Sequence, residues 1–160
     1  MREELLSIIE KNSKIALKDL AAMLNSSEID VANEITAMEK EGIICGYPTL
    51  IDWEKTAIDK VTAIIEVRVT PQKGLGFDKM AERIYNYPEV QTVYLISGGY
   101  DLMVIIEEKS LKEIANFVSD KLSTLDNVLS TATHFILKKY KDNCTIMTRK
   151  YEGDREIIVP

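Results

Sequence analysis

The 160-residue sequence is poor in the side chains that build disulfide scaffolds, metal centres and many catalytic sites. Its two cysteines, Cys45 and Cys144, lie far apart and form no Cys-x-x-Cys pattern. This spacing excludes a disulfide framework and a cysteine-rich zinc site, and it suits a reducing cytoplasm. Because His134 is the single histidine, the chain offers little for histidine-based catalysis or metal binding. We therefore predict a cytoplasmic protein with no catalytic residues, no bound metal and no cofactor.

The sequence also lacks the long apolar runs and the motifs that mark membrane proteins and common enzymes. No apolar run approaches the ~18 residues of a membrane span, and residues 1–10 lack the basic start and apolar middle of a signal peptide. Neither a phosphate-binding glycine loop nor a nucleophile elbow is present. With 46% hydrophobic and 29% charged residues, the composition is typical of a soluble globular protein. An enzyme is not expected.

Acidic charge is concentrated in the first third of the chain. The formal net charge is −6 at pH 7, and residues 1–52 hold five Lys or Arg against ten Asp or Glu. This balance argues against a protein that binds polyanions through bulk charge. The apolar pattern changes after the same stretch, from a helical period to alternating strands and helices, which predicts a domain boundary there.

Three short helices are predicted within the first 42 residues, because apolar side chains recur there every three or four positions. The third helix, over residues 28–41, follows two serines that can cap it and ends at a glycine. Its buried face is formed by Val31, Ile35 and Met38. Residues 43–47 are β-like. Three helices followed by a strand are typical of a winged helix-turn-helix.

Two copies of a strand–helix–strand unit follow. The predicted strands cover residues 61–70, 90–97, 101–107 and 131–140, and the predicted helices begin near residues 77 and 110. The order βαββαβ is that of a ferredoxin-like domain, so the fold class is α+β. The predicted parts are a winged helix-turn-helix at 1–52, a connector at 53–60, a ferredoxin-like domain at 61–141 and a C-terminal tail at 142–160.

The sheet is expected to need a partner. Several strands are apolar on both alternating faces, as where Ala63 and Ile65 point one way and Ile64 the other. Two helices cover one face of a four-stranded sheet only, so a second copy of the chain is the simplest cover for the other face. The alternative is that the first domain folds back over the sheet.

At this point the residues resemble a known family. The string Glu39-Lys40-Glu41-Gly42-Ile43-Ile44-Cys45-Gly46-Tyr47, continued by Ile51-Asp52, resembles the LE-x-x-G-I-I-x-G-Y…D signature of the Lrp/AsnC (feast/famine) transcription regulators. Asp19-Leu20-Ala21 is similar to the family's E-L-A. Further similar segments are Pro88-Glu89-Val90, Ser97-Gly98-Gly99-Tyr100-Asp101-Leu102 and Thr131-Ala132-Thr133. The resemblance spans residues 3–141.

The resemblance implies a cytoplasmic regulator that binds double-stranded DNA through the third helix. One departure opposes this: helix 28–41 holds one lysine and five acidic residues, a net charge of −4, and the family's DNA-facing basic pairs here read Asn33-Glu34 and Thr36-Ala37. Such a helix is expected to be repelled by phosphates. The remaining candidates for DNA binding are Lys14, Lys18, Ser26, Ser27, Asn33 and Lys40.

The resemblance also implies a small effector, usually an amino acid, bound between subunits of dimers that assemble further, often to octamers. The turn 98–101 can by itself be a tight hairpin whose glycines supply positive φ. As an effector site, it would bind a carboxylate through backbone N–H groups and an ammonium group through Asp101. The candidate effector residues are Gly98, Gly99, Tyr100, Asp101, Thr131 and Thr133.

Two functions remain open from the sequence. The first is an effector-controlled, sequence-specific DNA-binding regulator, in which the ligand shifts assembly and repositions paired DNA-reading helices. The second is an effector-sensing oligomer that has lost DNA binding and acts through protein partners, because its first domain is acidic.

Overall fold

The computed structural model of the protein describes residues 1–70 and 76–148. The chain divides into two compact units that meet between Thr49 and Leu50. Across the described ranges, every helix is too short or too polar to span a lipid bilayer.

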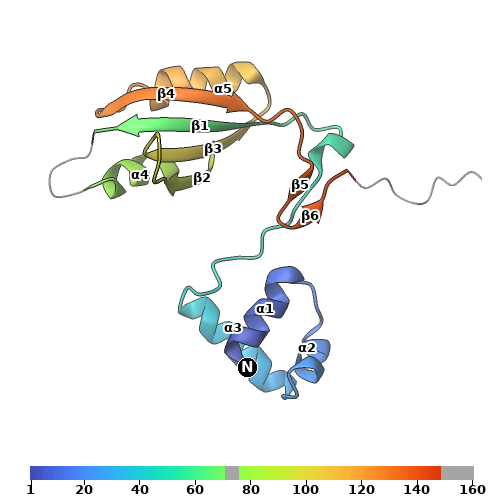
Figure 1. The fold of residues 1–160 in the computed structure, drawn as a ribbon. Helices are drawn as coiled ribbons and strands as arrows, with labels where there is room; N and C mark the ends of the chain where they lie inside the picture. The colour runs from blue at the N-terminus through green and yellow to red at the C-terminus, as the bar shows by residue number, and fades with distance from the viewer. Residues whose placement is uncertain (71–75, 149–160) are drawn as a thin grey trace, which may run out of the picture. The chain divides into compact units, whose positions relative to one another are not determined.

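The first unit is a bundle of three helices, α1 (Arg2–Lys11), α2 (Leu17–Met23) and α3 (Glu28–Lys40) (Figure 1). Between α2 and α3 the chain turns at Asn25, which has a positive φ of 49°. Ser27 then caps α3, because its hydroxyl accepts a hydrogen bond of 3.1 Å from the Asp30 amide. One apolar core joins the helices, and its fully buried members include Leu5, Val31 and Met38.

The wing strand predicted at residues 43–47 is not formed. Gly42 adopts a φ of +73°, and the amides of Ile43 and Ile44 both donate hydrogen bonds to the Met38 carbonyl, at 2.9 and 3.2 Å. These bonds close the end of α3 in the manner of a helix stop. The segment has β-forming residues, but within the described chain no strand pairs with it, so it runs without regular structure.

The second unit confirms the predicted ferredoxin-like fold. In chain order it contains a short 3-10 turn η1 (Trp53–Lys55), β1 (Val61–Val69), α4 (Asp78–Tyr85), β2 (Val90–Leu95), β3 (Leu102–Glu108), α5 (Leu111–Phe117) continued by the π-turn η2 (Val118–Leu122), and β4 (Val128–Phe135). The antiparallel strands lie side by side in the order β2-β3-β1-β4 (Figure 1). Ser110 begins α5 as predicted, since its hydroxyl accepts from the Glu113 amide at 3.2 Å.

Both long helices of this unit cover the same face of the sheet. The alternate residues of β1, such as Ile65 and Val67, are fully buried together with Val104 and Ile106 of β3. Side chains from α4, α5 and η2 belong to the same core; they are Met80, Ile84, Ile114, Phe117 and Leu122. The other face of the sheet, called here the open face, carries no helix of the described second unit.

The open face is more polar than the sequence analysis predicts. Register places Ile64 of β1 beside Ile105 of β3, with Tyr94 of β2 beside Met103. Glu66 lies in the middle of the same face, and its carboxylate is 3.4 Å from the imidazole of His134 on β4. The face is therefore apolar at its centre and carries an acid–histidine pair toward β4.

The last strand and the tail also differ from the expectation. β4 runs from 128 to 135 rather than from 131 to 140, because its backbone is paired with β1 from Val69 to Ala63. The start of the predicted tail forms a small hairpin of β5 (Lys141–Asp142) and β6 (Thr145–Ile146). Residues 149–160 of that tail lie outside the described residues.

Candidate functional site

One side of α3 projects a continuous stripe of side chains into solvent. Ile29, Asn33, Thr36 and Lys40 are exposed and follow one another at steps of four, three and four residues, which keeps them on one helical face. The buried face opposite is formed by Val31 and Met38, with the half-buried Ile35 and Glu34 beside them. We call these four residues the exposed stripe of α3. It contains no carboxylate.

Two acidic residues, Glu34 of α3 and Glu41 directly after it, form ion pairs with an arginine of α1. The Arg2 guanidinium donates hydrogen bonds of 2.7 and 3.1 Å to the two carboxylate oxygens of Glu41, and its Nε contacts Glu34. Glu34 is only 23% exposed in this arrangement. Glu34 follows Val31 and precedes Met38 on the inward side of the helix, so its carboxylate lies away from the exposed stripe.

Charge pairing at this arginine changes the electrostatics of the helix. The hydrogen bond from Arg2 holds the pKa of the Glu41 carboxyl below its ordinary value of 4.5. The hydrogen bonds to Glu41 and Glu34 in turn raise the pKa of Arg2. A third acid, Glu39, accepts a 2.8 Å hydrogen bond from the Tyr47 hydroxyl, whose pKa is raised by desolvation and then by this bond. Asp30 accepts from the Ser27 hydroxyl, so four of the five acids of residues 28–41 are engaged within the first unit.

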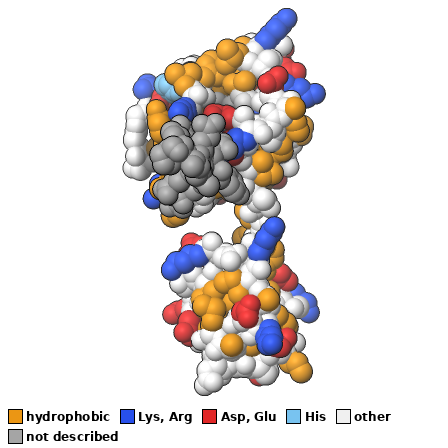
Figure 2. All heavy atoms as spheres, turned by 90° about the vertical axis from the view of Figure 1, so that its right-hand side faces the viewer, with side chains coloured by type: hydrophobic (Ala, Val, Ile, Leu, Met, Phe, Trp, Pro, Cys, Tyr) orange, Lys and Arg blue, Asp and Glu red, His pale blue; other side chains and the backbone are white. Residues whose placement is uncertain are grey.

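The predicted DNA-binding residues are all placed at the surface of the first unit except Ser26, which is half-buried. Within the described residues, Lys14, Lys18 and Lys40 have no ion-pair partner, so their charges are available to an anion. The hydroxyl of Ser27 is occupied, since it accepts from the Asp30 amide and donates to the Asp30 carboxylate at 2.7 Å. Figure 2 shows acidic and basic side chains interspersed on the displayed face of this unit.

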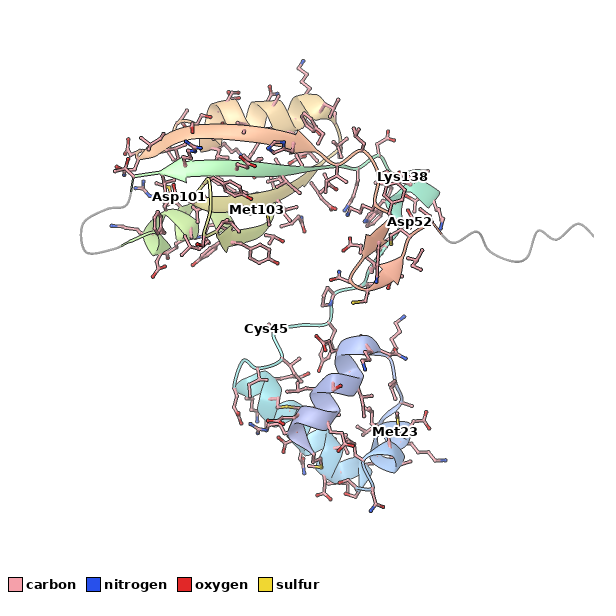
Figure 3. The ribbon with its side chains drawn as sticks, viewed as in Figure 1. Met23, Cys45, Asp52, Asp101, Met103 and Lys138 are labelled. Atoms are coloured by element: carbon pink, nitrogen blue, oxygen red, sulfur yellow. The ribbon has the colours of Figure 1, made fainter. Side chains whose placement is uncertain are left out.

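The predicted effector turn is fixed by Asp101. This residue follows Gly98, Gly99 and Tyr100 between β2 and β3, and Figure 3 shows it at one end of the sheet, far from Lys138 at the other. The Asp101 amide donates to the Val67 carbonyl at 3.1 Å, and its Oδ2 accepts from the Val69 amide at 2.9 Å. One carboxylate oxygen of Asp101 therefore holds the turn against the end of β1.

The two glycines of the turn are not required by the fold of a single chain. Neither has a positive φ, in contrast to the tight-hairpin interpretation from the sequence. A Cβ atom at Gly98 would meet the Ile96 side chain at an ordinary 3.8 Å, and a Cβ at Gly99 would meet nothing within 4 Å. The space in front of Gly99 is thus open to a group from outside the chain.

Strand pairing brings the predicted threonines to the same end of the sheet as the turn. Val67 of β1 pairs with Leu102, next to Asp101, on one side and with Thr131 on the other. Two strand spacings separate them, roughly 10 Å. Thr133 lies two residues along β4, opposite Ile65, and both threonines are half-buried on the helix-covered side. The turn and the threonines can therefore line one site.

A cavity that the sequence analysis does not predict lies in the second unit. It measures about 620 Å³ and lies at the end of the sheet away from Asp101, where η1 and the hairpin β5–β6 approach Thr62 and Glu107. The Glu107 carboxylate accepts from Lys60 at 3.0 Å, and the Lys60 ammonium also lies 4.1 Å from the ring centroid of Trp53. Neither at this cavity nor anywhere else in the described chain is a group of three or more His, Cys, Asp or Glu arranged to hold a metal ion.

The sequence analysis did not include Ile29, Thr36 or Arg2 among the candidate residues, although it placed Thr36 at a DNA-facing position of the family. Projection of α3 as a helix would have found the first two, because they lie opposite Val31 and Met38. No local pattern identifies Arg2, since its partners are 32 and 39 residues away.

The chain is similar to known regulators of transcription. The family model of the Lrp/AsnC ligand binding domain matches residues 62–146. The uncharacterized HTH-type transcriptional regulator YugG of Bacillus subtilis is 47% identical over 158 residues, covering 98% of this chain and 95% of that protein. The HTH-type transcriptional regulator LrpA of Pyrococcus abyssi is 30% identical over 137 residues, covering 86% of this chain and 94% of LrpA.

A solved structure has the same fold. A transcriptional regulator of Neisseria meningitidis, determined as a complex with L-Met, superposes with a TM-score of 0.70 at 20% identity, covering 88% of this chain and 90% of that one. Both the helix-turn-helix unit and the ferredoxin-like unit thus have counterparts in regulators of transcription. The chain belongs to the Lrp/AsnC family of transcriptional regulators.

Proposed function

We propose that this protein is a sequence-specific DNA-binding regulator of transcription in the cytoplasm, controlled by an amino-acid effector bound between its subunits. α3 enters the major groove of double-stranded DNA, and the turn 98–101 with Thr131 and Thr133 binds the effector. The acid-free exposed stripe of α3 is the observation that supports DNA binding most directly, because the face of the acidic helix that would approach DNA carries no carboxylate.

Affinity for DNA is expected to rest on few phosphate contacts. Lys14, Lys18 and Lys40 are the unpaired cations predicted to reach phosphates, and counterion release by three cations supplies only modest affinity. Assembly compensates for this: linking several weak DNA-binding units raises the overall affinity by about 10² to 10⁴. A regulator built this way depends on its oligomeric state.

The effector site is inferred from the open space at Gly99 and the half-engaged carboxylate of Asp101. Backbone N–H groups of the turn suit a carboxylate, and the Asp101 oxygen that does not hold Val69 suits an ammonium group. The L-Met found with the Neisseria meningitidis regulator is an amino acid of this kind. Ligand binding at this end of the sheet would shift the assembly of dimers into higher oligomers, such as an octamer.

The open face supports dimerisation. Ile64, Met103, Ile105 and Tyr94 form an apolar centre on a face that no described helix of the second unit covers, and a second copy of the same sheet is complementary to it. The dimer places two copies of α3 in one particle, which is what a palindromic DNA site requires.

Titration with DNA tests the proposal. The full-length protein is mixed with DNA from upstream of its own gene and with a scrambled duplex across a salt series. Preferential binding with a shallow dependence on salt supports a regulator that reads bases through few phosphate contacts. No binding at low salt contradicts it, and would favour the alternative of an effector-sensing oligomer that acts through protein partners.

Effector binding is tested separately by thermal unfolding of the protein against the twenty amino acids. A ligand at 100 times its Kd raises the free energy of unfolding by about 2.7 kcal/mol, which is readily detected. Absence of a shift with every amino acid would remove the effector assignment and leave DNA binding unaffected.

A further inference from the structure

The chemistry of the exposed stripe of α3 matches one kind of base pair. We propose that this stripe reads A·T base pairs in the major groove, with Asn33 as the residue that recognises adenine. The inference rests on the proposed function, since it assumes that α3 enters the groove, and it adds which bases the helix selects.

Asn33 is free to bind a base edge. Its side chain is exposed, and among the described residues none forms a hydrogen bond with its amide. A side-chain amide carries both an acceptor and donors, which is the complement of adenine N6 and N7, and a bidentate pair of this type discriminates against the other bases. Asn33 also lies in the first half of α3, the part of a recognition helix that contacts base edges.

The neighbours of Asn33 on the stripe present methyl groups. Ile29 is 73% exposed one turn before it. Thr36 lies on the other side, and its hydroxyl donates a 2.9 Å hydrogen bond to the Ala32 carbonyl within the helix. Because that hydroxyl is engaged, the methyl group is what Thr36 offers to DNA. Apolar groups contact the C5-methyl of thymine, which is the partner of adenine.

The stripe lacks the groups that read G·C pairs. The commonest contact to guanine is a bidentate arginine or lysine. Arg2 is the single arginine of the first unit, and Glu34 and Glu41 hold its guanidinium against α3. Lys40 lies seven residues after Asn33, about 10 Å along the helix. That position at the end of α3 suits a phosphate.

The test is selection of binding sites by the full-length protein from a randomised duplex library, followed by titration of the selected site and its single-pair variants. Asn33→Ala is compared with the wild type, with Lys40→Ala and with Ser7→Ala. Ser7 is an exposed residue of α1 that makes no side-chain hydrogen bond among the described residues, so it is a matched polar-to-alanine control. Circular dichroism verifies that each variant is folded.

We expect selected half-sites to contain A·T pairs, with one adenine whose replacement costs the wild type ~5- to 150-fold in affinity. Asn33→Ala should lose that discrimination, while Lys40→Ala should weaken all duplexes equally and reduce the salt slope by about one. Ser7→Ala should behave as the wild type. Sites without A·T preference, or an Asn33→Ala variant with unchanged discrimination, would overturn the inference although DNA binding stands. Failure to bind any duplex would overturn the proposed function and this inference together.

Discussion

The hydroxyl of Ser27 already forms hydrogen bonds within the protein, so it is not free to bind DNA. Its hydroxyl accepts from the Asp30 amide at 3.1 Å and so satisfies one of the free N–H groups at the start of α3. The same hydroxyl donates to the Asp30 carboxylate. A base or phosphate would have to compete with both bonds, so Ser27 contributes mainly by fixing where α3 begins.

We therefore predict that Ser27→Ala lowers the free energy of unfolding of the first unit by about 1 kcal/mol. Ser27→Asp keeps an acceptor at the cap and should stay near the wild type. Ser26→Ala is the control, since the Ser26 side chain makes no hydrogen bond among the described residues. Urea unfolding followed by circular dichroism gives the values, and amide exchange in α3 assigns the loss to the first unit. Equal stability of Ser27→Ala and Ser26→Ala would show that the cap is not stabilising.

One carboxylate oxygen of Asp101 accepts the hydrogen bond from the Val69 amide, and the other is proposed to bind the ammonium group of the effector. Two variants separate these two roles. Asp101→Ala removes the acceptor of the Val69 amide in a half-buried position, which should cost about 1–3 kcal/mol. Asp101→Asn keeps that acceptor and loses the negative charge.

Asp101→Asn should therefore unfold near the wild-type temperature but bind the amino acid found by thermal screening at least about tenfold more weakly. Isothermal titration calorimetry measures the affinity. Gly99→Ala serves as a second probe, because its Cβ meets no atom of the chain and should leave stability unchanged while obstructing the ligand. Full ligand affinity in both variants would place the effector elsewhere.

At the scale of elements, α1 and α3 are joined by an ion pair whose strength depends on pH. Arg2 lowers the pKa of Glu41 below its ordinary 4.5, so the folded state holds the ionised carboxylate more firmly than the unfolded state does. The stabilisation is present above pH 4.5 and is lost as the pH falls through the lowered pKa of the folded protein.

We predict that Glu41→Gln is less stable than the wild type at pH 7 and that the two proteins converge at low pH, where protonated Glu41 resembles glutamine. Thermal unfolding of the helical signal between pH 7 and pH 3 measures this. Glu10→Gln is the control, because Glu10 is exposed on α1 and has no ion-pair partner in the described chain. A constant difference between wild type and Glu41→Gln across this range would refute the role of the ion pair.

The elements were predictable where local pattern decides them, and not where a distant partner does. Apolar spacing indicated all three helices of the first unit and the βαββαβ order, because burial follows the helical and strand periods. Residues 43–47 have β-forming side chains but no pairing strand, and Ile43 and Ile44 close α3 instead. β4 begins at Val128, three residues before the predicted start, because its bounds depend on register with β1.

The candidate sites divide in the same way. The sequence could place Asn33, Gly99 and Asp101 on the helix and turn where they are found. It could not show that Glu34 turns inward toward Arg2, since no local signal links residues 32 apart. That contact holds the Glu34 carboxylate away from the exposed stripe of α3, which contains no acid.

For the whole molecule, DNA binding and assembly are expected to be linked. A single α3 presents one acid-free stripe with few cations near it, so its affinity for DNA is expected to be low. The apolar centre of the open face, at Ile64, Met103, Ile105 and Tyr94, is the surface through which two chains would be joined. If it is the dimer contact, disrupting it should also disrupt DNA binding, although no DNA contact is changed.

Ile105→Lys tests this link, because it places a charge at the centre of the open face. A charge buried there without a partner should weaken the dimer by about 3 kcal/mol or more, roughly 100-fold. The loss of a second α3 should then reduce DNA affinity by about 10² to 10⁴.

Leu111→Lys is the matched control, since Leu111 is 55% exposed on α5, which packs on the other side of the sheet. Analytical ultracentrifugation and DNA titration are made on the same samples. A dimeric Ile105→Lys protein would mean that another surface joins the chains, and a monomeric one with wild-type DNA affinity would mean that a single α3 is sufficient.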